Sequence, residues 1–206
     1  MRRQILPAIR MTVVATLVLG LLYPLAMTGL AQGLFHDNAE GSLIKRDGQV
    51  VGSSLVGQAF TEPQYFHTRP SAAGPLASGS LVDGEAADPD DLSLAASGAS
   101  NEGPTDPDLL AAVAERTASY RQENGLDDDV EVPIDAVTAS ASGVDPHISV
   151  ANARLQAPRV AAERGLSLPT ILRLVDDHTA GRSLGFLGEK GVNVLELNLA
   201  LDDLAG

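Results

Sequence analysis

The feature that most constrains this chain is an uncharged apolar run near its N-terminus, residues 11–35 (MTVVATLVLGLLYPLAMTGLAQGLF). As an α-helix, a run of this length extends over about 37 Å, more than the roughly 30 Å of a bilayer's hydrocarbon core. Polar residues do not recur in it at helical spacing, which disfavours a helix on the surface of a soluble domain. The run therefore predicts a transmembrane helix.

Small residues and a proline distinguish this predicted helix. A proline breaks an isolated helix in water, but in a membrane it persists as a kink when neighbouring groups satisfy the freed carbonyl. Small side chains let a second membrane helix approach closely. We therefore expect packing against another membrane helix through Gly20, Pro24, Thr28 and Gly29.

The charges flanking the run predict its orientation. Three arginines and no acidic residue precede residue 36: Arg2, Arg3 and Arg10. Basic residues remain on the cytoplasmic side of a membrane helix. We therefore expect a single-pass protein of the cell membrane, with residues 1–10 as a basic cytoplasmic tail and residues 36–206 outside the cytoplasm.

A cleaved signal peptide is the alternative to a membrane anchor. Small residues ahead of Gln32 resemble a cleavage site, and cutting after Ala31 would release an exported cation- or solute-binding module. The apolar run is long for a signal sequence, which favours the uncleaved anchor. Both interpretations export the same part of the chain.

The exported part is strongly acidic. The whole chain has a net charge of −13, and residues 36–206 hold 11 basic against 27 acidic residues, a net of −16. This balance argues against nucleic acid as a partner, because phosphates bind basic surfaces. It also creates a negative potential that enriches cations within about 8–10 Å of the surface. The absence of cysteine excludes disulfides, cysteine-ligated metals and thiol catalysis.

Local patterns in the exported part predict an α+β domain with a small sheet and about three helices. Asp47-Gly48 between Ser42–Arg46 and Gln49–Val56 predicts a β-hairpin, and residues 65–69 predict a further strand. Residues 71–104 read as a long Gly-, Ser-, Ala- and acid-rich loop. Alternating leucines at residues 195–201 predict a final strand with one buried face.

The three predicted helices are delimited by capping residues. The first is capped by Asp106 and ends at Gly125; the second runs from Asp145-Pro146 to Gly165 with a kink or break at Pro158. The third begins after Ser167 and ends near Ala180, before Gly181.

Catalytic motifs are absent from the sequence. It contains no phosphate-binding loop, no dinucleotide fingerprint and no G-x-S-x-G elbow. A membrane-anchored hydrolase is the alternative, with a triad of Ser140 or Ser142, His147 or His178, and Asp135. Simpler roles for the two histidines are a polar position in a first helical turn and a helix C-terminus. We therefore expect no catalytic residue and no metal ligand.

Several runs, in order along nearly the whole chain, match one known family. The longest is residues 132–149 (VPIDAVTASASGVDPHIS). The others are residues 19–24 (LGLLYP), 56–60 (VGQAF), 65–74 (YFHTRPSAAG), 97–101 (SGASN), 156–161 (QAPRVA), 178–182 (HTAGR), 184–188 (LGFLG) and 192–195 (VNVL). Together they resemble the C subunit of the Kdp-type potassium-transporting ATPases, although Pro75–Ala96 is longer than that family's usual connection.

The resemblance implies an accessory, non-catalytic subunit of a high-affinity, ATP-driven potassium uptake complex. Its implied partners are a channel-like potassium-binding subunit, a P-type subunit that hydrolyses ATP, and a small single-span subunit. ATP, magnesium and potassium are used by the complex, with none bound directly by this chain. The resemblance further implies a role in assembly, a position over the potassium entrance, and an effect on ATP affinity that must be indirect for a chain exported beyond residue 35.

Within the matching runs, polar and aromatic residues are the candidates for interaction or structural roles. They are Gln58, Tyr65, Arg69, Asn101, Asp135, Asp145, His147, Arg159 and Arg182. In so acidic a domain, we expect the arginines to form structural ion pairs with carboxylates.

Overall fold

The computed structural model describes residues 2–73 and 97–205, so predictions for the insert Pro75–Ala96 lie outside the described residues. The chain divides into two units, Met1–Leu43 and Ile44–Gly206, which we call the anchor unit and the globular unit. Each unit is described by itself.

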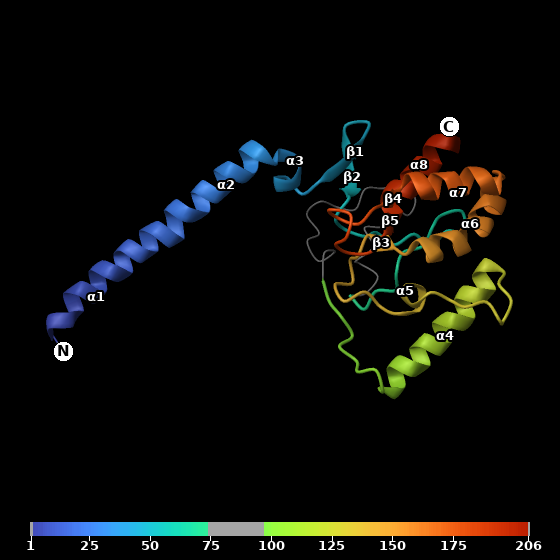
Figure 1. Cartoon of the computed structure of the whole chain (residues 1–206), viewed down its shortest axis with the longest axis horizontal. Coiled ribbons are helices and arrows are strands. Elements are labelled where there is room, and N and C mark those ends of the chain that lie inside the picture. Colours follow the sequence, from blue (N-terminus) through green and yellow to red (C-terminus); the bar gives the residue numbers. More distant parts are fainter. Residues whose placement is uncertain (1, 74–96, 206) are drawn as a thin grey trace. The chain divides into compact units, whose positions relative to one another are not determined.

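The anchor unit is one long helix followed by a short turn of helix (Figure 1). Its elements are α1 (Arg2–Ala15), the π-helical η1 (Thr16–Leu22), α2 (Tyr23–Leu34) and α3 (His36–Ala39). The stretch Arg3–Leu34 is long and apolar enough to cross a membrane. The helix thus extends further toward the N-terminus than the predicted residues 11–35.

A π-helical stretch precedes Pro24. The N–H of Tyr23 donates to the carbonyl of Val18, five residues back, in place of the usual four. A proline ring clashes with the carbonyl four residues before it, and a widened turn relieves that clash. The helix therefore continues through Pro24 by way of a locally widened turn.

The globular unit contains two small antiparallel sheets. The first pairs β1 (Leu43–Arg46) with β2 (Gln49–Ser53), and the second has the order β3-β5-β4, with β3 (His147–Ile148), β4 (Thr179–Ala180) and β5 (Gly191–Asn193). The predicted hairpin is confirmed. Asp47 and Gly48 have φ angles of 52° and 80°, the left-handed conformation that a tight two-residue hairpin turn requires.

Helices of the globular unit begin and end largely at the predicted caps. The helices are α4 (Pro107–Asn124), α5 (Ile134–Val137), α6 (Val150–Arg164), α7 (Leu168–Asp177) and α8 (Val194–Ala205). The Asp106 side chain accepts from the N–H of Asp108, and Gly125 closes α4 with φ 60°. Ser167 caps α7, but α7 ends at Asp177, because the next residues form β4.

The second helix starts five residues later than predicted. Ser149, whose side chain accepts from the N–H of Asn152, is its N-cap. His147 lies in β3 and not in a first helical turn. Pro158 lies inside α6, which continues through it as one helix.

The predicted strand at residues 195–201 is wrong, because these residues form α8. Alternating leucines suggested a period of two, but the fully buried positions include Val194, Leu197, Asn198 and Leu201. Their spacing of three, four and seven residues is that of one helical face. A buried asparagine in that face concealed the helical period.

The main core lies between α6, α7, α8 and β5 (Figure 1). It is built around Phe66, Ile171, Val192 and Leu197, each fully buried. A second, smaller cluster forms where α4 meets α5, around Tyr120 and Val137. The polar groups described next are carried mainly by α4, α6 and α8.

Candidate functional site

Residues 63–67 belong to no strand: a turn closed by a hydrogen bond from the N–H of Tyr65 to the carbonyl of Glu62 leads into the buried Phe66. Side chains of two helices form hydrogen bonds with the backbone N–H and C=O groups of this segment. Asn198 on α8 accepts from the N–H of Phe66 and donates to its C=O, both at 2.9 Å. Gln156 on α6 accepts from the N–H of His67 at 2.7 Å and donates to its C=O at 3.1 Å. We call residues 63–67 the clamped segment.

Two arginines complete the clamp. Arg159 donates to the carbonyls of Pro63 and Tyr65, the latter at 3.0 Å, and Arg164 donates to the carbonyl of Gln64 at 3.0 Å. The Arg164 guanidinium also lies 4.6 Å from the ring centre of Tyr65. The predicted strand at residues 65–69 is therefore wrong, because side chains supply the hydrogen bonds that a neighbouring strand would have given.

Arg159 is the centre of a buried polar network. Its side chain is only 6% exposed and reaches Glu123, 3.6 Å away. It also donates to the side-chain oxygens of Asn124 and Gln156, both at 3.0 Å. Burial lowers the pKa of Arg159, and the nearby Glu123 carboxylate opposes that shift.

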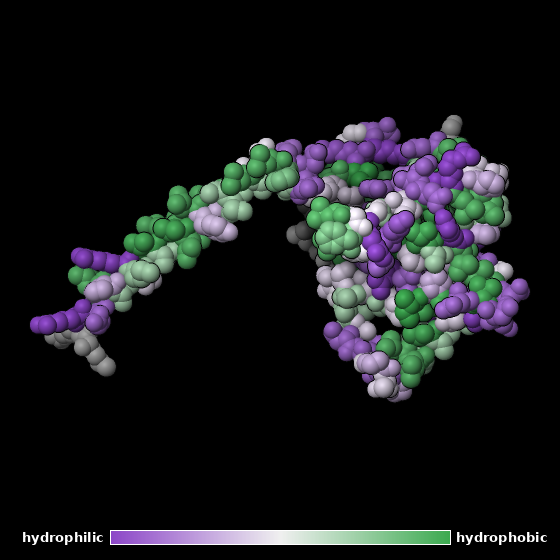
Figure 2. Space-filling view, viewed as in Figure 1, coloured by the Kyte–Doolittle hydropathy of each residue, from purple (hydrophilic) through white to green (hydrophobic). Residues whose placement is uncertain are grey.

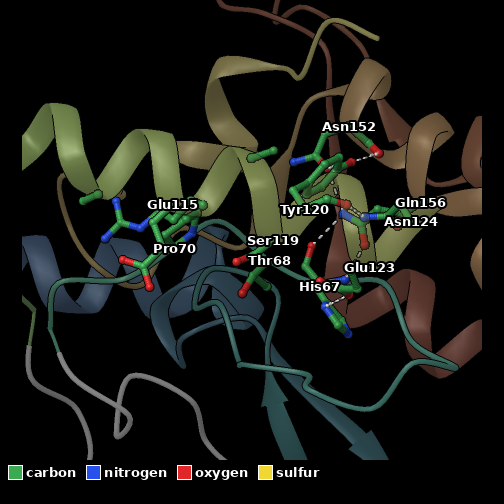
Figure 3. A pocket seen from close by; sticks show the side chains of 13 residues that line it. His67, Thr68, Pro70, Glu115, Ser119, Tyr120, Glu123, Asn124, Asn152 and Gln156 are labelled. Carbon is green, nitrogen blue, oxygen red and sulfur yellow. Dashed lines mark hydrogen bonds and ion pairs between the residues drawn. The ribbon is translucent and has the colours of Figure 1, made fainter. Parts of the chain in front are cut away.

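A polar pocket of about 390 Å³ opens beside this network (Figure 3). One wall is the face of α4 that carries Ser119, Tyr120 and Glu123, and the opposite wall includes His67 and Gln156. Tyr120 donates to the Asn152 side chain at 2.8 Å, and burial raises the pKa of its phenol far above the ordinary range, with Asp135 adding to the shift. The polar side chains that line the pocket are thus largely hydrogen-bonded to one another.

His67 and Glu123 form a hydrogen bond at the pocket's edge, with 2.7 Å between Nδ1 and Oε1. The hydrogen bond from His67 lowers the pKa of the Glu123 carboxyl, although partial burial opposes the shift. The folded protein therefore binds a proton at Glu123 less readily than the unfolded chain. The carboxylate stabilises the fold at neutral pH.

We expect the contribution of Glu123 to stability to be complete above pH 4.5, the ordinary pKa of the group, and to disappear as the pH falls through the lower folded-state pKa. Urea unfolding of Glu123→Gln should show a deficit at pH 7 that shrinks toward acid pH. The exposed Glu131→Gln is the control and should show no such trend. A deficit for Glu123→Gln that persists unchanged at pH 3 would contradict this assignment.

A second cluster lies around the start of α6. Arg69 forms the expected ion pair with Asp145, at 3.0 Å, and Asp145 also accepts from the backbone N–H of His147. Asp135 accepts from the backbone N–H and the hydroxyl of Ser149, at 2.7 and 2.8 Å, and from Asn152 at 3.0 Å. Four of the predicted residues thus meet here, and their contacts fix the entry into β3 and α6.

Of the remaining predicted residues, Tyr65 is in contact with Arg159, whereas Gln58, Asn101 and Arg182 lie apart. Gln58 donates to the carbonyl of Val51 at 2.9 Å, and the Tyr65 hydroxyl donates to Asp202 at 3.4 Å. Asn101 is exposed, with φ 58°, and donates to the carbonyl of Ala99. Arg182 forms its expected ion pair, with Glu189, at 2.8 Å on an exposed loop.

The proposed hydrolytic triad is not assembled in the described part of the chain. Ser140 and Ser142 lie 3.1 Å from one another and accept from backbone N–H groups of the turn that follows them. The Asp135 carboxylate accepts hydrogen bonds from Ser149 and Asn152, not from a histidine. His178 terminates α7 as the simpler interpretation expected. Within residues 2–73 and 97–205, no group of three His, Asp or Glu side chains is placed to hold a metal ion.

Sequence reasoning missed the buried amides, two of which, Gln156 and Asn198, hold the clamped segment. The buried amides are Asn124, Asn152, Gln156, Asn193 and Asn198. The sequence around an amide has no local pattern that separates a buried position from a surface one. The usable indications were Gln156 and Asn193, which fall inside two of the matching runs.

Comparison with known proteins gives a consistent result. The family model described as "K+-transporting ATPase, c chain" matches residues 5–203. The potassium-transporting ATPase KdpC subunit of Mycobacterium tuberculosis (strain H37Rv) is 55% identical over 204 residues, which is 99% of this chain and 100% of that protein. The KdpC subunit of Gemmatimonas aurantiaca is 50% identical over 205 residues, covering 100% and 95% of the two chains, and that of Methylococcus capsulatus is 50% identical over 198 residues, 96% of each. The chain therefore belongs to the KdpC family, a subunit family of the potassium-transporting ATPases.

Proposed function

We propose that this chain is a non-catalytic, single-pass accessory subunit of an ATP-driven potassium uptake complex. The observation that carries the proposal is the anchor helix in a member of the KdpC family. Its large apolar side chains, from Ile5 to Phe35, are 44% to 70% exposed. Such a surface needs lipid or other membrane helices around it. In the proposed orientation, residues 1–10 are cytoplasmic and residues 36–206 lie outside.

The partners proposed for the helix are the channel-like potassium-binding subunit, the ATP-hydrolysing P-type subunit and the small single-span subunit. A Cβ added at Gly29 would meet nothing within 4 Å, so this side of the helix has room for a neighbour's backbone. Together with Gly20, Pro24 and Thr28, it forms the proposed contact with a membrane helix of the channel-like subunit.

The role proposed for the exported domain is to stabilise the assembly at the potassium entrance. The hydrogen bonds of Arg69, Asp135 and Arg159 hold the domain's own segments together, which supports a rigid binding module over an enzyme. The net charge of −16 on residues 36–206 favours accumulation of cations nearby. ATP and magnesium act at the cytoplasmic P-type subunit, and any influence of this chain on ATP affinity is a coupling through the complex.

Two experiments test this proposal. The first is protease treatment of sealed right-side-out vesicles, and the second is purification of the undigested, tagged chain from potassium-starved cells. We expect external protease to digest the globular unit, and the undigested chain to co-purify with a large ATP-hydrolysing membrane subunit. Protection of the globular unit, or recovery of the chain alone, would contradict the proposal. Mass measurement of the mature chain tests the anchor, because loss of residues 1–31 would identify a released module.

A further inference from the structure

The loop between β4 and β5 exposes apolar side chains that the proposed function has not used. Leu184, Phe186 and Leu187 are 83%, 69% and 50% exposed, and Leu184 is more exposed than the other large apolar residues described in the globular unit. Figure 2 shows a hydrophobic patch on the flank of the globular unit, where this loop lies in Figure 1. We call residues 183–188 the apolar tip.

The apolar tip is a turn closed by a backbone hydrogen bond. Leu187 donates its backbone N–H to the carbonyl of Ser183 at 2.9 Å, and these two residues form an isolated antiparallel bridge. Beneath the tip, Arg182 donates to both carboxylate oxygens of Glu189, at 2.8 and 3.0 Å. The three apolar side chains therefore project from an ordered support.

Leu184 occupies a conformation that costs a leucine free energy. Its φ is 54°, in the left-handed region that Gly and Asn adopt far more readily. The position gives no compensating burial within the globular unit, since the side chain is 83% exposed. An exposed leucine at a strained backbone position suggests a function for the side chain itself.

We propose that the apolar tip inserts into an apolar pocket, rimmed by carboxylates, on the exported face of another protein subunit of the same complex. Residues 181–190 carry Arg182, Glu189 and Lys190, a net of +1 in a domain of net −16, so an acidic rim meets less repulsion here than over the domain as a whole. A lipid bilayer is a less suitable partner for the apolar tip than a protein pocket. A protein pocket can match a strained turn in shape, whereas a fluid bilayer cannot.

This inference rests on the proposed function and is tested in the intact complex in native membranes. A benzophenone amino acid is placed at Phe186 and, as the matched control, at Leu110, which is 57% exposed on α4. We expect light-dependent cross-linking from position 186 to a second polypeptide of the complex, at least about fivefold above position 110. Cross-links to lipid alone, equal yields at the two positions, or no cross-link would each overturn the inference.

A second measurement tests whether the apolar contact is the cause of the cross-link. Benzophenone at Leu187 is combined with Leu184→Asn, which suits the left-handed backbone but removes the apolar group. We expect the cross-link to fall about tenfold, whereas Leu110→Ser leaves it unchanged; an unchanged yield with Leu184→Asn would overturn the inference. Thermal unfolding of each variant confirms that the domain is folded. If the chain co-purifies with the ATPase but does not cross-link, this inference fails alone; if it does not co-purify, the proposed function fails.

Discussion

Replacing Arg159 by methionine is expected to lower the free energy of unfolding by about 3–5 kcal/mol. Methionine keeps the apolar stem but removes every guanidinium hydrogen bond. The buried side-chain oxygen of Asn124 and the partly buried carbonyl of Tyr65 then lose this donor, whereas the oxygen of Gln156 keeps the N–H of His67. Each buried acceptor left unpaired carries a desolvation cost of about 1 kcal/mol or more.

Urea denaturation of the purified chain, followed by circular dichroism, measures this loss. The matched control is Arg154→Met on the same helix, which removes an ion pair with Asp176 whose side chains are 58% and 60% exposed. We expect the control to change the unfolding free energy by no more than about 0.5 kcal/mol. Equal effects of the two substitutions would show that Arg159 does not organise the buried network.

The second large effect is expected for Asn198→Leu, which should cost about 2–5 kcal/mol. Leucine fits the apolar face of α8 but offers no partner to the backbone of Phe66. Phe66 is fully buried, so its N–H and C=O would both remain without the hydrogen bonds that they make at 2.9 Å. The clamped segment would then lose its attachment to α8.

Denaturation of this variant is compared with that of Gln122→Leu, which makes the same chemical change on the exposed surface of α4. We expect the surface change to lie within about 0.5 kcal/mol of the parent protein. If Asn198→Leu were as stable as its control, the paired amide contact with Phe66 would not contribute to the fold.

Features with local causes could be predicted from the sequence. The hairpin depends on the two residues Asp47 and Gly48, and α4 depends on the cap at Asp106 and on Gly125. In each case, residues within a few positions decide the conformation. The apolar anchor helix is likewise decided by its own composition.

Features that depend on distant partners could not be predicted. Asn198 looked like the polar side of a strand because its partner, Phe66, is 132 residues away. Residues 65–69 looked like a strand because nothing nearby indicates that side chains satisfy their backbone. Among the candidate site residues, the ion pairs of Arg69 and Arg182 followed from the excess of carboxylates. The composition of the chain gives no comparable indication of the buried amides around Arg159.

The clamped segment also constrains the order in which the domain becomes complete. Its partners on α6 and α8 lie 89 and 132 residues further along the chain, so the segment leaves the ribosome long before either amide has been synthesised. Contacts of such long range form late, after loop closure has brought the ends together. The hydrogen bonds of the segment from Pro63 to His67 therefore form only after nearly the whole polypeptide has been synthesised. The contact with α8 then joins an early part of the domain to a late one.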